Sequence, residues 1–408
     1  MTREPAGVHA ATLRLLAQRG RVVQSRTRVV AAAARARRGG PRAYTLWPDA
    51  RRPMLSADMG YPPAAEWLRG TMVPTLRRLP DAATWMSLRA GAALVSDEEG
   101  LAERVGAGLT GARTRPRLAL FSPSGQAVSK AVCFLFREGD SLPSVVVKAM
   151  AEPRFAWRLR AESELLARVR DRVAHDAWVA ATLPPRPGFA GDNAGEFVLA
   201  EPFDPLGAAT GSGGPGPARE WLRLFQAASC VQVRSWSDAD ERTALAAARA
   251  GWRLAERDAE AAVAVRLRAL FAPLRGAELP RCAVHGDFWR GNVAAVAGSV
   301  RVYDWEWAAL DGTPLVDLWT YELAELRILA RDGERGLESH LVAALGRVRD
   351  ELRLRRLDER FALATLAPVL GTLSFRIRSR LGMPDEMERH SVPLIAAAER
   401  LLLSDEPF

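Results

Sequence analysis

The chain contains the octapeptide HGDFWRGN at residues 285–292, and the pentapeptide VYDWE follows at residues 302–306. Asp287 and Asn292 are thus five positions apart on one predicted loop, and Asp304 follows a short apolar segment. Phosphoryl transfer requires such a set of groups. One carboxylate accepts the proton of an attacking hydroxyl, while an amide oxygen and a second carboxylate hold the magnesium that neutralises the phosphates. The spacing therefore predicts a phosphoryl-transfer site.

Lysine and asparagine are rare in this chain. Among its 57 Lys and Arg residues only Lys130 and Lys148 are lysines, and its only asparagines are Asn193 and Asn292. The abundance of Ala, Arg, Gly and Pro suggests a coding bias that removes Lys and Asn wherever a substitute works. Lys148 ends the apolar run 145–147, which predicts a buried strand. Because Arg is bulkier and forked, it replaces a compact ammonium poorly in a tight phosphate site, so Lys148 is a candidate phosphate ligand.

The two motifs resemble the signature of the aminoglycoside phosphotransferase and choline kinase-like family, H-G-D-x-x-x-x-N followed by a buried strand that ends in Asp. The resemblance covers roughly residues 100–400 and is strongest across 281–320. It implies an α+β, bilobal protein kinase-like fold with a small N-lobe, which holds an antiparallel sheet, and a larger, mostly helical C-lobe. It also implies ATP and Mg²⁺ as cofactors, and a hydroxyl group of a small molecule (aminoglycoside, amino sugar or amino alcohol) as acceptor.

The resemblance assigns roles around the octapeptide. Asp287 would be the catalytic base, and Asn292 and Asp304 would coordinate magnesium through oxygen. His285 would hold the loop by hydrogen bonds. Glu306 could contact the metal or its surroundings, or be a solvated acid, and both interpretations remain open.

A structural role is implied further along the chain. Asp317 matches a family position that would brace the catalytic loop.

Lys148 matches the lysine that grips the nucleotide phosphates in kinase-like folds, where it pairs with a Glu of the following helix. The apolar pattern predicts that helix over 154–175. Glu162 is the favoured partner, because apolar residues four and seven positions later would seat it against the core. Glu164 is the alternative.

Two further nucleotide contacts follow from the resemblance. Ser124 and Gly125 would lie over the phosphates, in a small polar loop that precedes an extended segment at 127–136. This loop departs from a glycine-rich loop because Gly125 is its only glycine, and a plain hairpin turn explains it equally well. After a predicted buried strand, Glu201 and Phe203 would contact adenine through their main chain.

Four segments are predicted. Residues 1–42 form an Arg-rich helical or partly ordered segment, 43–99 an N-terminal elaboration of unknown role, 100–203 the kinase-like N-lobe and hinge, and 204–408 the helical C-lobe with the catalytic loop and the acceptor pocket. Acidic residues of the C-lobe could line a pocket for a cationic acceptor, but a solvated helix face is the favoured interpretation. These acids are Glu322, Glu325, Asp332 and Glu334.

The basic charge is concentrated at the N-terminus. Residues 1–42 contain ten arginines and one acid, so this segment alone carries the net charge of +9. Four of its arginines recur every seven residues, which would align them on one helix face: Arg14, Arg21, Arg28 and Arg35. We favour a solvated helix face or partly ordered tail. The alternative is a basic surface for an anionic membrane or an acidic partner; nucleic acid is not expected.

The composition limits the remaining possibilities. With 48% apolar and 26% charged residues, the chain is typical of a soluble globular protein. Three cysteines without metal-ligand spacing favour reduced core residues and a cytoplasmic location. No stretch approaches the length of a membrane span, and no secretory signal is expected. A second hypothesis is a catalytically inactive, kinase-like adaptor that binds nucleotide, or an anionic surface through the basic N-terminus.

Overall fold

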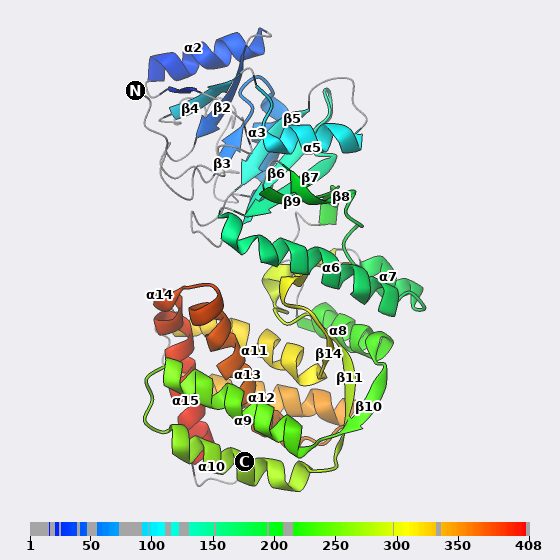
Figure 1. The fold of residues 1–408 in the computed structure, drawn as a ribbon, viewed down its shortest axis with the longest axis vertical. Coiled ribbons are helices and arrows are strands. Elements are labelled where there is room, and N and C mark those ends of the chain that lie inside the picture. The colour runs from blue at the N-terminus through cyan, green and yellow to red at the C-terminus, as the bar shows by residue number, and fades with distance from the viewer. Residues whose placement is uncertain are drawn as a thin grey trace. The chain divides into compact units, whose positions relative to one another are not determined.

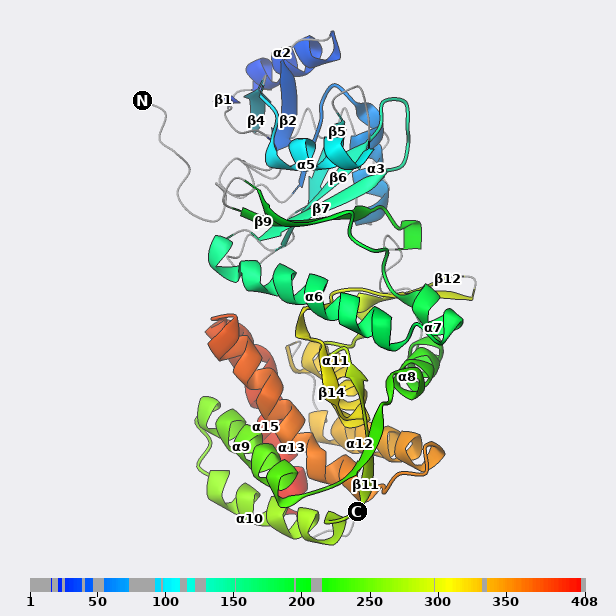
Figure 2. The same ribbon diagram turned by 45° about the vertical axis from the view of Figure 1, so that its right-hand side comes forward.

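The computed structural model describes all residues except 1–15, 17–20, 24–25, 39–40, 47–54, 73–91, 97, 111–115, 122–129, 151, 194–195, 207–214, 297, 332–335 and 405–408. The described residues form two compact units, whose elements are labelled in Figures 1 and 2. The sheet unit comprises residues 1–167, 183–210 and 294–306. The helical unit comprises residues 168–182, 211–293 and 307–408. The sequence analysis set the boundary between the two lobes after residue 203. In the structure, residues 168–182 belong to the helical unit and residues 294–306 to the sheet unit.

The sheet unit is built on a six-stranded antiparallel sheet with the strand order β3-β5-β6-β7-β9-β8. Its strands are β3 (Leu55–Ala57), β5 (Arg117–Phe121), β6 (Lys130–Phe136), β7 (Val145–Met150), β8 (Phe189–Asn193) and β9 (Glu196–Pro202). All six residues of β7 are buried, as expected of a central strand that opens with three valines. The predicted lysine strand therefore lies inside the sheet.

Two helices cover opposite faces of this sheet, α3 (Pro62–Met72) and α5 (Leu101–Thr110). Cys133 and Leu135 of β6 belong to the buried cluster that includes α5. Phe134 and Phe136, which alternate with them, belong to the cluster that includes Trp67 of α3. Side chains of a strand alternate between faces, so both faces of the sheet are buried.

The N-terminal part of the sheet unit forms a separate three-stranded sheet in the order β1-β4-β2, accompanied by α2 (Arg26–Arg37). Its strands are β1 (Arg21–Val23), β2 (Arg42–Leu46) and β4 (Ala92–Ser96). The prediction that residues 1–42 form a helical or partly ordered segment is wrong for β1, which pairs antiparallel with β4. Arg21 therefore does not share a helix face with Arg28 and Arg35, and Arg14 lies outside the described residues. Pairing with a strand 70 positions away overrides local helical periodicity.

The remaining elements belong mostly to the helical unit. Its helices are α7 (Ala177–Thr182), α8 (Pro215–Ser229), α9 (Asp238–Leu254), α10 (Glu260–Phe271), α11 (Pro314–Arg331), α12 (Leu337–Leu354), α13 (Arg360–Phe375), α14 (Pro384–Glu386) and α15 (Val392–Leu403). Its sheet has the order β10-β11-β14, with β10 (Gln232–Ser235), β11 (Glu278–Val284) and β14 (Ala309–Gly312). The hairpin β12 (Val293–Val296) and β13 (Ser299–Val302) and the helix α6 (Ala156–Arg172) contain residues of the sheet unit.

Several predicted elements are confirmed. The helix expected over 154–175 corresponds to α6. Ser237 caps α9, and its side chain and that of Asp240 form the reciprocal bonds of a capping box. The α+β architecture, with one unit that carries an antiparallel sheet and one that is mostly helical, is likewise confirmed.

The helix from Arg360 to Arg380 is long and apolar enough to cross a membrane, contrary to the expectation that no stretch approaches this length. However, 78% of its most apolar 18-residue window is buried inside the protein. It packs closely on α9, because a Cβ on Gly371 would lie 2.0 Å from the carbonyl oxygen of Ala247. This segment is therefore a core helix of the helical unit.

Candidate active site

The predicted site residues fall into two groups, one in each unit. The sheet unit holds Lys148, Glu162 and Asp304, whereas the helical unit holds Asp287 and Asn292. The two predicted phosphate-loop residues, Ser124 and Gly125, lie outside the described residues.

The pairing predicted for Lys148 is present in the sheet unit. Its Nζ on β7 lies 3.0 Å from Oε1 of Glu162 on α6. Leu166 and Val169, on the same face of the helix, are buried, so the turn of α6 carries Glu162 inward. Glu164 is exposed. The choice left open by the sequence is thereby decided in favour of Glu162.

Lys130, which the sequence analysis gave no role, lies in the same group. Its Nζ is 2.9 Å from Oε2 of Glu162 and 2.6 Å from Oδ1 of Asp304. The register of β6 and β7 sets Lys130 opposite Met150 and Lys148 opposite Val132. The two lysines are therefore diagonal neighbours on one face of the sheet, and each binds one oxygen of Glu162.

Asp304 and Glu306 complete this group. Asp304 follows β13 and has a φ of 64°, in the left-handed region that non-glycine residues rarely adopt. Glu306 is only 5% exposed, and its Oε1 accepts a hydrogen bond from Nε of Arg158 at 3.1 Å. Its Oε2 lies 2.6 Å from Nζ of Lys130. Glu306 is therefore not a solvated acid, because folding buries it between two cations.

The charges of this group stabilise one another. Burial alone would lower the pKa of Lys130, but the carboxylates of Asp304, Glu162 and Glu306 raise that pKa well above its ordinary value. Burial alone would raise the pKa of Asp304, but Lys130 and Lys148 hold that pKa well below its ordinary value. Both Lys130 and Asp304 are consequently charged at neutral pH.

The two predicted adenine contacts lie at the end of β9. Glu201 places Oε1 2.8 Å from Nζ of Lys148, and burial raises the pKa of Glu201 although Lys148 opposes this shift. The backbone N–H of Phe203 donates to the carbonyl oxygen of Ser144 at 3.0 Å, so this N–H is already engaged. Main-chain contacts of Glu201 and Phe203 with adenine remain a prediction.

In the helical unit, Asp317 braces the loop that follows β11. Its Oδ2 accepts the backbone N–H of His285 at 2.8 Å, and its Oδ1 accepts that of Gly286 at 2.7 Å. Asp317 lies in the first turn of α11 and is fully buried, and burial raises its pKa although His285 and the two N–H donors oppose this shift. The bracing role predicted for Asp317 is confirmed.

Asp287 and Asn292 are linked within this loop. Nδ2 of Asn292 donates to the carbonyl oxygen of Asp287 at 2.9 Å and lies 3.3 Å from its Oδ2. The backbone N–H of Asp287 donates to Nδ1 of the fully buried His285 at 3.3 Å. Because the amide nitrogen of Asn292 is fixed in this way, Oδ1 is the atom that this side chain offers to a cation.

Gly286 allows the loop to approach the chain beyond Asp304. Its φ of +79° lies in the left-handed region, and a Cβ there would be 2.2 Å from the carbonyl oxygen of Trp307. The carbonyl oxygen of Gly286 accepts a hydrogen bond from Nη1 of Arg376 at 2.5 Å. Burial lowers the pKa of Arg376, although Asp287 and Asp317 oppose the shift. Arg376 thus holds the loop through a hydrogen bond, and the main chain of Trp307 lies close to Gly286.

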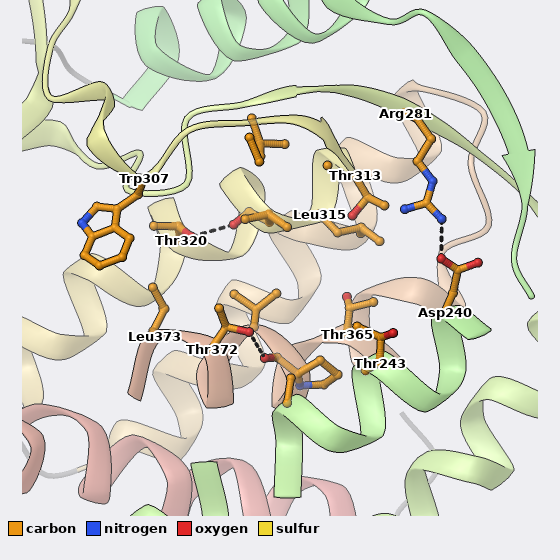
Figure 3. A pocket seen from close by; sticks show the side chains of 18 of the residues that line it. Asp240, Thr243, Arg281, Trp307, Thr313, Leu315, Thr320, Thr365, Thr372 and Leu373 are labelled. Carbon is orange, nitrogen blue, oxygen red and sulfur yellow. Dashed lines mark hydrogen bonds and ion pairs between the residues drawn. The ribbon is translucent and has the colours of Figure 1, made fainter. Parts of the chain in front are cut away.

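Trp307 and Arg376 also line a cavity of about 310 Å³ within the helical unit (Figure 3). Side chains of α9, α11, α13 and the β11–β14 pair surround it, and most are apolar. Five threonines contribute polar groups: Thr243, Thr313, Thr320, Thr365 and Thr372. Among the described lining residues Asp240 is the single acid, and its carboxylate lies 2.5 Å from Nη2 of Arg281.

The acids considered as an alternative pocket lining are Glu322, Glu325, Asp332 and Glu334, and the structure describes the first two. Glu322 is buried and forms ion pairs with Arg219 and Arg347, so the expectation of a solvated face is wrong for this residue. Glu325 is paired with Arg290 at 3.1 Å. Neither Glu322 nor Glu325 lines the cavity, and Asp332 and Glu334 lie outside the described residues.

Residues 221–356 match the family model described as the phosphotransferase enzyme family. This segment belongs to that family. The phosphotransferase segment contains Asp287, Asn292, Asp304 and Asp317, so the resemblance stated from the two motifs is confirmed over the stretch that carries them. The prediction that the chain is an enzyme of the phosphotransferase class is confirmed with it.

Solved structures similar to this chain include two phosphotransferases of low identity. The apo form of a thermostable mutant of aminoglycoside phosphotransferase APH(4)-Ia is 15% identical, with a TM-score of 0.46, over 74% of this chain and 99% of that chain. Glucosamine kinase in complex with glucosamine, ADP and inorganic phosphate is 17% identical, with a TM-score of 0.39, over 69% and 82% of the two chains. No protein among those with curated functions matches this chain.

The residues around the phosphotransferase segment fit a divalent cation. Within the sheet unit, Glu162, Asp304 and Glu306 place carboxylate oxygens, which magnesium prefers, within 4.8 Å of one another. The sequence analysis assigned no role to Lys130. The signal that could have found it is its rarity, since the chain contains only two lysines.

Proposed function

We propose that this protein is an ATP- and magnesium-dependent phosphotransferase that acts on a hydroxyl group of a small molecule. The observation that carries the proposal is the braced loop, in which Asp317 accepts the N–H groups of His285 and Gly286 and Asn292 is bonded to Asp287. A base that must meet a substrate hydroxyl within hydrogen-bond reach has to be held in place before the reaction. The fully buried carboxylate of Asp317 supplies that rigidity.

Each group has a distinct role in the proposed reaction. Asp287 orients the acceptor hydroxyl and takes its proton. Asn292 and Asp304 would hold Mg²⁺, which neutralises charge on the phosphates when it is bound. Lys148 binds the phosphates as a compact ammonium, and Glu162 fixes its direction through the 3.0 Å contact.

We infer that the cavity beside the loop receives the acceptor, because Trp307 and Arg376 belong both to its lining and to the contacts of Gly286. Its threonine hydroxyls suit an acceptor that carries hydroxyl groups. Its one carboxylate, on Asp240, is already paired with Arg281. This lining favours a small amino alcohol or amino sugar with few positive charges over a polycationic aminoglycoside, within the acceptor classes that the sequence predicts.

The substitution Asp287→Ala tests the function. With Mg-ATP and a panel of amino alcohols, amino sugars and aminoglycosides, product formation is followed by mass spectrometry. Loss of the base should lower kcat/KM by about 10²–10⁴, while the thermal unfolding temperature stays close to that of the wild type. Asp258→Ala, which removes an exposed acid of the same unit, is the matched control.

Two results would overturn the proposal. A variant with Ala at position 287 that keeps more than about a tenth of wild-type turnover would remove Asp287 from the role of base. The inactive adaptor would be favoured if no acceptor were phosphorylated and nucleotide bound without magnesium. The acidic residues that the reaction needs are all present, which argues against the adaptor.

A further inference from the structure

Lys130 occupies the centre of the acidic group in the sheet unit. Its Nζ lies 2.9 Å from Oε2 of Glu162, 2.6 Å from Oδ1 of Asp304 and 2.6 Å from Oε2 of Glu306. The three carboxylates belong to α6 and to the segment after β13, and each offers an oxygen within 4.8 Å of the others. Three oxygens at this spacing surround the position of a single cation, and the ammonium of Lys130 lies there.

The oxygens on the outer side of this group are held by other cations. Oε1 of Glu162 binds Lys148 at 3.0 Å, and Oε1 of Glu306 accepts a hydrogen bond from Nε of Arg158 at 3.1 Å. Each glutamate is therefore held through its Oε1, while its Oε2 contacts Lys130. The positions of the two glutamate oxygens therefore do not depend on Lys130 alone.

Glu306 contributes a buried carboxylate oxygen to this position. Its Oε2 is buried and forms an ion pair with Nζ of Lys130 at 2.6 Å, without a hydrogen bond of standard geometry. The residue is only 5% exposed. A buried carboxylate oxygen needs a cationic partner, which Lys130 supplies here and which a divalent cation would supply in its place.

We propose that Lys130 is a tethered cation that holds the metal position of the Glu162, Asp304 and Glu306 cluster until a divalent cation displaces it. Two cations cannot share three oxygens at this spacing without strong repulsion. Metal binding in the absence of nucleotide is therefore suppressed. When nucleotide enters, its phosphates offer the displaced ammonium a second anionic partner. This role of the nucleotide rests on the proposed function.

The test is binding of Mn²⁺ to the full chain in the absence of nucleotide, measured by calorimetry or by the Mn²⁺ resonance signal. Removal of the competing charge in Lys130→Met should tighten Mn²⁺ binding at least about tenfold. Lys148→Met is the matched control, because Lys148 has the same side-chain exposure of 11% and also pairs with Glu162. It should tighten binding less than about threefold, because its contacts are Glu162 and Glu201 rather than Asp304 and Glu306.

The double variant Lys130→Met with Asp304→Asn should lose the gain in affinity. Equal effects of the two lysine substitutions, or wild-type binding as tight as that of Lys130→Met, would overturn the proposal, as would a gain that survives the loss of Asp304. Should Lys130→Met fail to fold, Lys130→Gln, which is neutral and still donates hydrogen bonds, carries the same expectation. Because Mn²⁺ binding needs no turnover, this result stands apart from failure of the proposed phosphotransferase function.

Discussion

Asp317 shows how a single buried carboxylate controls the loop. It accepts two backbone N–H groups, one on each oxygen, at 2.8 Å and 2.7 Å. In Asp317→Asn only one oxygen remains to accept, and an amide N–H₂ faces the other donor. We expect the free energy of unfolding to fall by about 1–3 kcal/mol and turnover to fall with it, as measured by urea denaturation and steady-state kinetics.

Asp311→Asn provides the comparison for Asp317. Asp311 lies on β14 with a side chain that is 67% exposed, so its substitution should change the free energy of unfolding by less than about 0.5 kcal/mol. Equal stability of the two variants would contradict the bracing role.

At the scale of elements, α9 and α13 approach so closely that two glycines are required. A Cβ on Gly371 would lie 2.0 Å from the carbonyl oxygen of Ala247, and one on Gly251 would lie 2.5 Å from Cα of Gly371. Gly371→Ala should therefore lower the free energy of unfolding by about 1–3 kcal/mol. The added Cβ would meet main-chain atoms of α9, which cannot move aside as a flexible side chain can. Urea denaturation measures the change.

Gly346→Ala is the control, because it tests the same substitution in α12 where no atom lies within 4 Å of the added Cβ. At that exposed helical position alanine should stabilise the protein by up to about 1 kcal/mol. A destabilisation of similar size at both glycines would mean that helix packing is not the cause.

The contact between α9 and α15 gives a pH dependence. Hydrogen bonds from Arg257 hold the pKa of Glu399 below its ordinary value of 4.5, and Trp252 of α9 also donates to this carboxylate. Because the pKa of Glu399 is lower in the folded state than in the unfolded state, its carboxylate stabilises the fold at pH values above the unfolded pKa. This stabilisation is lost as pH falls through the folded pKa.

Glu399→Gln should consequently be less stable than the wild type near neutral pH, and the difference should shrink as pH falls below about 4.5. Urea denaturation of both proteins between pH 7 and pH 3.5 measures it. A difference that stays constant over this range would show that the contact stabilises through packing instead.

At the scale of the whole molecule, nucleotide binding should stabilise the folded chain. Mg-ATP at about 100 times its dissociation constant adds roughly 2.7 kcal/mol, which corresponds to a rise of a few degrees in the unfolding temperature. Asp304→Ala removes a carboxylate from the proposed metal ligands, so the rise should disappear. ATP with a chelator is the control, and Mg-GTP in parallel decides between the two nucleotides.

A rise that persists in Asp304→Ala would place the metal ligands elsewhere, whereas a rise that persists with the chelator would show that nucleotide binding does not need magnesium. The wild-type measurement also separates a working nucleotide site from the adaptor hypothesis, which predicts binding without a need for magnesium.

Local sequence determined the parts of this protein whose chemistry is contained in a short segment. The octapeptide at 285–292 places Asp287 and Asn292 on one loop, and the valine run before Lys148 forms a central strand. The period of α6 selects Glu162 as the partner of Lys148. In each case spacing along one element fixes which side chains share a face.

Only the tertiary structure decided the features that depend on distant segments. Lys130 meets Asp304 across 174 positions of sequence, and Glu306 is buried by Lys130 and Arg158 rather than solvated. Strand β1 forms because β4 offers it a partner, and the cavity exists where α9, α11 and α13 surround the β11–β14 pair. The periodicity of a sequence describes one helix or strand at a time. Ion pairs and strand pairings between segments far apart in the sequence form only when the folded chain brings those segments together.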